Sequence, residues 1–206
     1  MKLLETNFLF SLISMCVHDA LECLTFIFRM MKKEGITDNN TSMEGIINYI
    51  ALACSALSLI LDIVAVAIPN WISKSPLNYG LWKYCVLDVC IDISDIYSLR
   101  ALQEPDYIKA TQALLIIGLI MMAVAIVLVV MKLFVMKDNA FLSIGAAVSA
   151  IAGGVLILVG AIVFAAKATQ EIGVTADMLS AGFALAIVAG VIAIIAGILF
   201  FIGNIK

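Results

Sequence analysis

The residues of this sequence that could do chemistry gather in one short stretch, NYGLWKYCVLDVC, at positions 78–90. Two cysteines, Cys85 and Cys90, lie here among aromatic residues, a glycine and an aspartate. A catalytic cysteine needs a base such as histidine, and the one histidine of the chain, His18, is far away in the sequence. A zinc site needs further ligands beyond two cysteines. We therefore predict no catalytic residue, no metal site and no cofactor.

A structural disulfide is the remaining interpretation of the two cysteines. The segments Tyr79–Tyr84 and Val86–Ile93 are rich in aromatic and β-branched residues, which predicts two short strands around a turn near Asp88. Cysteines with four residues between them can face each other across such a hairpin. A disulfide between Cys85 and Cys90 would hold together a sheet that is too small to be stable by itself.

The rest of the chain is far more apolar than a soluble protein of this size. Of its 206 residues, 64% are hydrophobic and only 13% are charged, and the mean hydropathy is +1.16. A run of about 20 apolar residues is long enough to cross a bilayer. Four such runs predict an all-α membrane protein, a four-helix transmembrane bundle, with spans at 46–68, 110–131, 141–166 and 180–203. The net charge of −3 and the lack of a basic cluster argue against a nucleic-acid partner.

The positive residues and the cysteine pair give the orientation. Lysine and arginine favour the cytoplasmic side, and here six of them flank the spans on the side of the bundle's two ends against five on the other side. The disulfide decides between the two sides, because it forms outside the cytosol. We expect a plasma-membrane protein with outer loops at 69–109 and 167–179. Both ends of the bundle, including a short tail at 204–206, would lie in the cytoplasm.

Small residues repeat at intervals of four in the last two spans. Transmembrane helices associate through close packing of small residues, because the surrounding lipid is as apolar as the helices themselves. We therefore predict two helix-packing faces, one in the third span and one in the fourth. Their residues are Gly145, Ser149, Gly153, Gly182, Ala186 and Gly190.

Asp62 is the one charged residue within the predicted spans. An acidic group inside a span is costly and is a functional hypothesis by default. Because Asp62 lies only six residues before Ile68, we place it toward the outer interface. We favour a carboxyl group near the lipid headgroups that is hydrogen-bonded to a neighbouring helix or protonated, and an ion-handling role is the alternative. A membrane enzyme would need a cluster of ionisable residues, so we expect no enzymatic activity.

The order of these features resembles one known family. Pro69 and Trp71 follow the first span, then come Gly80-Leu81-Trp82 and the two cysteines. This order within four spans is similar to that of the claudin superfamily, which includes the peripheral myelin protein, epithelial membrane protein and calcium-channel gamma-subunit branches. The resemblance covers about residues 46–203, and the close spacing of the two cysteines leaves the branch open. The matching positions are Trp71, Gly80, Leu81, Trp82, Cys85 and Cys90.

The resemblance implies a bundle topped by a small extracellular antiparallel β-sheet, which Trp71 and the Gly-Leu-Trp residues anchor at the membrane boundary. It implies a protein of cell–cell contacts that associates with itself or with other claudin-like proteins. The alternative is an auxiliary or trafficking subunit of a channel or another membrane protein. If the outer loop lined a pore, Asp88, Asp92 and Asp95 would favour cations. An ordinary solvated loop is the simpler interpretation of these charges.

Residues 1–45 precede the first span and form an N-terminal region of their own. A polar stripe along residues 8–28 predicts an amphipathic helix at the cytoplasmic membrane surface. A fifth span and a signal peptide are the other two interpretations of this segment. Asn39 and Asn40 each begin a glycosylation acceptor pattern, and the predicted orientation leaves both unmodified.

Overall fold

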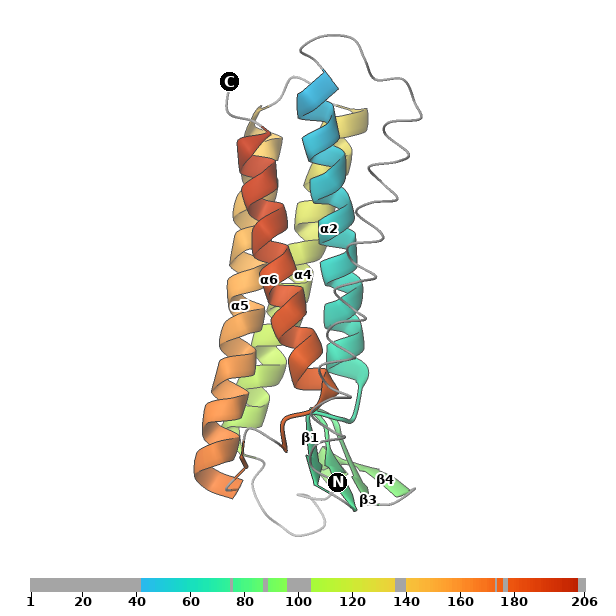
Figure 1. The fold of residues 1–206 in the computed structure, drawn as a ribbon, viewed down its shortest axis with the longest axis vertical. Coiled ribbons are helices and arrows are strands. Elements are labelled where there is room, and N and C mark those ends of the chain that lie inside the picture. Colours follow the sequence, from blue (N-terminus) through green and yellow to red (C-terminus); the bar gives the residue numbers. More distant parts are fainter. Residues whose placement is uncertain are drawn as a thin grey trace.

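Four long helices run side by side, and a small sheet lies at one end of them (Figure 1). The computed structural model describes residues 42–74, 76–86, 89–95, 105–135, 140–172, 174–175 and 178–203. The helices are α2 (Ser42–Ala67), α4 (Asp106–Phe134), α5 (Ala140–Ile172) and α6 (Ala181–Ile202). Each of them is long and apolar enough to cross a membrane. The predicted four-span, all-α membrane fold is confirmed.

Helix α5 extends well beyond the predicted span 141–166. The apolar run ends at Ala166, because Lys167, Gln170 and Glu171 follow it. The helix nevertheless continues to Ile172, since these polar residues are good helix formers and no glycine or proline interrupts them before Gly173. The connection to α6 is therefore shorter than the predicted outer loop 167–179.

The sheet lies between α2 and α4 in the sequence and is antiparallel throughout. Its strands occur in the order β1-β2-β3-β4, each paired with the next. Their bounds are β1 (Ile72–Lys74), β2 (Leu77–Tyr79), β3 (Lys83–Val86) and β4 (Val89–Asp92). One isolated bridge from Ile72 to Leu179 also ties β1 to the segment before α6. The predicted small antiparallel sheet is thus confirmed.

The predicted strand Tyr79–Tyr84 is wrong in one respect, because the chain turns at Gly80 between β2 and β3. The N–H of Gly80 donates to the carbonyl of Lys83 over 2.9 Å, which closes this turn. A Cβ atom at position 80 would lie 2.4 Å from Cα of Pro69, so no side chain fits there. The second predicted strand contains β4, and the turn expected near Asp88 falls outside the described residues.

Helices α2 and α6 pack against each other in antiparallel directions. Each contributes one line of buried residues, called its seam below, in which neighbours are alternately three and four positions apart. The hydroxyl of Ser58 on α2 donates to the carbonyl of Ala189 on α6 over 2.8 Å, which fixes their register. Such spacing is typical of helices that pack along their whole length. The α2 seam consists of Asn48, Ala51, Ser55, Ser58, Asp62 and Ala65, and the α6 seam of Gly182, Ala186, Ala189, Ala193, Ala196 and Phe200.

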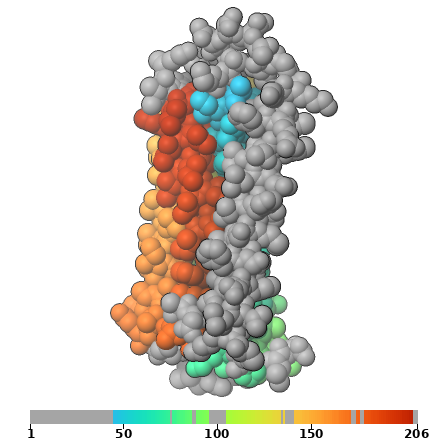
Figure 2. All heavy atoms as spheres, viewed as in Figure 1, coloured from blue at the N-terminus to red at the C-terminus, as the bar shows by residue number. Residues whose placement is uncertain are grey.

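Glycines mark the points where α5 approaches its two neighbours. A Cβ atom on Gly153 would lie 3.0 Å from the carbonyl oxygen of Gly118 on α4. A Cβ atom on Gly154 would lie 2.7 Å from the carbonyl oxygen of Gly190 on α6. The absence of these side chains lets the backbones come close, as in other membrane bundles. Side chains of α5 and α6 fill the space between the two helices on the face shown in Figure 2.

Candidate functional site: the sheet and its anchor on the bundle

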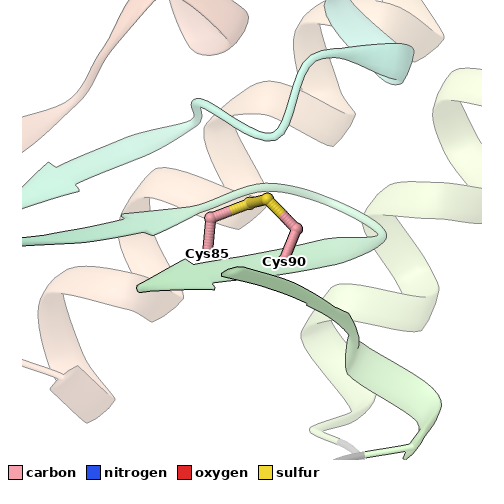
Figure 3. The surroundings of a disulfide bond; sticks show 2 residues. All are labelled: Cys85 and Cys90. Atoms are coloured by element: carbon pink, nitrogen blue, oxygen red, sulfur yellow. A yellow bond between two sulfur atoms is a disulfide. The ribbon is translucent and has the colours of Figure 1, made fainter. Parts of the chain in front are cut away.

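Cys85 and Cys90 form a disulfide between neighbouring strands (Figure 3). They stand directly opposite each other in the β3–β4 register, with their Cα atoms 4.0 Å apart. Cys85 on β3 is buried, whereas Cys90 on β4 is exposed. The predicted disulfide is confirmed, and it fastens the outermost strand to the rest of the sheet.

Trp71 joins the sheet to the helices, and the proline two residues earlier explains how. In a continuing helix, the N–H of residue 69 would donate to the carbonyl of Ala65, but Pro69 has no N–H. The indole Nε1 of Trp71 turns back and donates to that carbonyl over 2.8 Å. The Pro-x-Trp sequence therefore ends α2 and satisfies the carbonyl group that the proline leaves without a partner.

The ring of Trp71 is fully buried among side chains of α5 and α6. Its centroid lies 4.9 Å from that of Phe164 and 6.5 Å from that of Phe183, and both pairs meet edge to face. Its backbone N–H donates to Tyr79 of β2, and its carbonyl accepts from Ser180 just before α6. One residue thus connects α2, α5, α6 and the sheet. The family resemblance predicts an anchor at the membrane interface, whereas the structure shows the ring fully buried.

The three residues Gly80, Leu81 and Trp82 have three different environments. Gly80 lies against Pro69, as described above. Leu81 is fully buried, and its carbonyl accepts a 2.8 Å hydrogen bond from the side-chain amide of Gln112 on α4. Trp82 is 41% exposed, and its carbonyl accepts from the N–H of Ile93. Leu81 therefore holds the sheet to α4, while the ring of Trp82 remains at the surface.

The described charges of the sheet include one pair of opposite sign that stands face to face. Asp92 on β4 stands opposite Lys83 on β3, and both side chains are exposed. Asp95 is exposed just beyond β4, and Lys74 is exposed on β1. Asp88 lies outside the described residues. Lys83 thus faces Asp92, whereas Lys74 lies on the opposite edge strand of the sheet.

Strand β4 is the outermost strand of the sheet and exposes all four of its residues. It pairs with β3 on one side, and no described residue pairs with it on the other. Val89 is 64% exposed and Ile91 is 42% exposed, although both are β-branched apolar residues. Unpaired edge strands with exposed apolar side chains are sites where another chain can add to a sheet.

The predicted packing residues of the third span face α4. Gly145 would place a Cβ atom 3.3 Å from Cδ1 of Leu128, and Gly153 contacts the backbone of Gly118. Ser149, between them, is almost fully buried. Sequence reasoning missed Gly118, which has no small residue three or four positions away within its own helix to draw attention to it.

The predicted packing residues of the fourth span do not share one partner. Gly182 contacts the indole of Trp71, and Gly190 contacts Leu158 and Gly154 on α5. Ala186 is fully buried on the seam that faces α2. The spacing of four was visible in the sequence, but the three residues pack against three different partners: the loop after α2, helix α2 and helix α5.

Asp62 is fully buried on the α2 seam, five residues before the helix ends at Ala67 on the side of the sheet. Neither of its carboxyl oxygens has a hydrogen-bond partner among the described residues, so of the two expected forms, hydrogen-bonded or protonated, the bond to a neighbouring helix is not observed. Ser58, one turn earlier, makes such a bond to α6 instead. Among the residues that the structure describes, no three His, Cys, Asp or Glu side chains lie close enough together to hold a metal ion.

A family model described as the PMP-22/EMP/MP20/Claudin family matches residues 45–200. The chain belongs to this family. The match spans nearly all of the four-helix bundle and the whole sheet with its disulfide. This claudin-family protein is thus a multi-pass membrane protein whose helices contact the lipid bilayer. No curated protein matches the chain.

Proposed function

We propose that this claudin-family protein acts at cell–cell contacts, where copies assemble side by side and between cells to form or regulate a paracellular barrier or junction. The observation that carries the proposal is the unpaired outer edge of β4 (Val89–Asp92). A strand with exposed apolar residues and free backbone groups fits addition to another sheet better than contact with solvent. Family membership supports the further expectation that the protein is not an enzyme.

The hydrogen-bond pattern tells which backbone groups of β4 are free for such pairing. Ile93 donates its N–H to Trp82, toward β3. Backbone direction alternates along a strand, so the N–H groups of Asp92 and Cys90 point away from β3. Lys83 and Asp92 accordingly form a non-hydrogen-bonded pair in the β3–β4 register. A second strand would bond to the β4 edge through Cys90 and Asp92.

This geometry permits a substitution that blocks the edge and spares the sheet. Asp92→Pro removes the outward N–H and takes no hydrogen bond from β3, whereas Ile91→Pro would break the sheet itself. Asp92→Asn removes the same charge but keeps the N–H, so it is the matched control. In non-adherent cells, we expect the unaltered protein and Asp92→Asn to cluster the cells and to crosslink into oligomers, and Asp92→Pro to do neither.

Two results of that experiment would contradict the proposal. Clustering by Asp92→Pro at the level of the unaltered protein would show that the β4 edge is not used. Absence of clustering together with co-purification of a channel or another membrane protein would favour an auxiliary or trafficking subunit instead.

The same proposal places the sheet outside the cell and both ends of the bundle inside. The Cys85–Cys90 disulfide supports this orientation, because cytosolic thiols stay reduced. The chain then divides into a cytoplasmic N-terminal region at 1–45, the four-span domain at 46–203 and a cytoplasmic tail at 204–206. Asn39 and Asn40 would then remain unglycosylated. A mass shift on glycosidase treatment would show that they lie outside the cell and would contradict this orientation.

Of the two described aspartates at β4, Asp95 would contribute more than Asp92 to a pore lined by the sheet. Lys83 stands opposite Asp92 and offsets its charge, whereas the pairing of the described strands places no lysine opposite Asp95. Asp95→Asn should then lower the preference of an epithelial layer for cations more than Asp92→Asn does. Equal permeability of both variants and the unaltered protein would leave the sheet as a contact surface with ordinary solvated charges.

A further inference from the structure

A carboxyl group without a partner lies in the seam between α2 and α6. Asp62 is fully buried there, and neither of its oxygens has a hydrogen-bond partner in the described structure. The bond from Ser58 to Ala189 and the antiparallel register place Ala186 across from Asp62. The facing side chain is thus a methyl group, which cannot donate a hydrogen bond.

The next turn toward the sheet holds the anchor of Trp71. Ala65, three residues after Asp62, accepts the indole hydrogen bond. Gly182, four residues before Ala186, is the residue against which the indole ring lies. The layer of Asp62 and Ala186 therefore directly adjoins the layer that seats Trp71. If α2 and α6 separated at Asp62, the contacts of Trp71 that anchor the sheet would also be disturbed.

The helices that pack against α2 bring few ionisable groups to this level. Helix α6 (Ala181–Ile202) has none. Between Gly45 and Ala67, α2 carries, besides Asp62, only Tyr49 near its other end and the thiol of Cys54, about two turns from Asp62. Helix α4 carries Asp106, Tyr107 and Lys109 at its sheet end, and the aspartate and the lysine are exposed there. The loop from Ile68 to Trp71 has no charged residue.

We propose that Asp62 is a proton-binding site whose occupancy controls how firmly Trp71 and the sheet are seated on the bundle. With the proton bound, the neutral carboxylic acid fits between the helices, because an uncompensated charge is excluded from so apolar a seam. When the acid gives its proton to water, the carboxylate requires hydration. Water then enters between α2 and α6, the two helices separate near Ala65 and Gly182, and the indole ring loosens.

The fluorescence of Trp71 reports this change directly. The chain has two tryptophans, so Trp82→Phe leaves Trp71 as the only emitter. In lipid nanodiscs, raising the pH from about 6 to about 9, which spans the range where a buried carboxyl can titrate, should shift the emission to longer wavelength and raise acrylamide quenching several-fold. Asparagine has nearly the same shape as aspartic acid and no titratable proton. A protein that carries both Trp82→Phe and Asp62→Asn should therefore show neither the emission shift nor the increase in quenching.

Two further measurements make the result decisive. Asp62→Ser, a second neutral variant, must behave as Asp62→Asn does, and the helical content from circular dichroism must stay constant across the pH range. An alkaline response that persists in the neutral variants would overturn the proposal. The absence of any response in the protein that retains Asp62 would also overturn it. A response accompanied by loss of helix would do the same, because Trp71 would then report unfolding.

Discussion

The indole ring of Trp71 occupies the space that any side chain at position 182 would need. A Cβ atom added to Gly182 would lie 2.6 Å from Cδ1 and 2.8 Å from Nε1 of Trp71. The N–H of Gly182 also donates to the carbonyl of Asn70 over 2.9 Å, so the loop after α2 and the start of α6 are held together at this point. The position of the sheet on the bundle therefore depends on a glycine in a different helix.

Replacement of Gly182 should disturb this anchor. We expect Gly182→Ala to lower the free energy of unfolding by about 1–3 kcal/mol, the usual cost of adding atoms to a packed site. Thermal unfolding in detergent micelles would measure the loss. Gly45→Ala is the matched control, since a Cβ at position 45 meets no atom within 4 Å. Equal unfolding temperatures for the two variants would show that the contact between Trp71 and Gly182 does not matter.

The indole hydrogen bond can be tested separately from the ring. Trp71→Phe keeps an aromatic side chain but leaves the carbonyl of Ala65 without the donor that replaces the N–H of residue 69. A buried acceptor without a partner costs about 1–3 kcal/mol. Trp82→Phe, at an exposed position, should change stability far less. If both variants unfolded at the same temperature in the same micelles, this interpretation of the Pro-x-Trp sequence would be wrong.

The helices were the most predictable part of the fold, because length and hydropathy alone determine which segments cross a bilayer. The disulfide was predictable from the spacing of Cys85 and Cys90 on a short hairpin. Strands β1 and β2 were not, since three-residue strands carry almost no alternation of polar and apolar residues. The turn at Gly80 was missed because its cause is the distant backbone of Pro69.

The sequence identified the residues of the candidate site but did not predict how they are arranged. The motif pointed to Trp71, but only the structure shows that its indole completes the end of α2. The burial of Asp62 depends on which face of α2 meets α6, and hydropathy does not distinguish the faces of so apolar a helix. Its spacing from Asn48, Ser55 and Ser58 was the one available signal, because these polar residues share the seam.

The crossing of α5 and α6 gives a third prediction. Gly154→Ala should destabilise the bundle by about 1–3 kcal/mol, because the new methyl group would meet the backbone oxygen of Gly190, which cannot move aside. Gly145→Ala meets only the flexible end of Leu128, so we expect a smaller effect. Denaturation of the two purified variants under identical conditions measures the difference. The opposite order of stabilities would refute these close contacts.

The disulfide should matter for the sheet and little for the helices. Replacing Cys85 and Cys90 together by serine removes a constraint worth about 2 kcal/mol for so short a loop. We expect faster hydrogen exchange in β3 and β4, with unchanged protection of α4, α5 and α6. Mass spectrometry of peptic fragments would detect this pattern. Uniform loss of protection throughout the chain would mean that the bundle itself depends on the disulfide.

Freeze-fracture imaging of transfected cells is the most direct test of the central claim that this claudin-family protein assembles through the free edge of β4. Cells without junctions of their own would express the unaltered protein, Asp92→Asn or Asp92→Pro at equal surface levels. We predict continuous intramembrane strands for the first two and dispersed particles for Asp92→Pro. Dispersed particles for all three proteins, or strands formed equally well by Asp92→Pro, would contradict the claim.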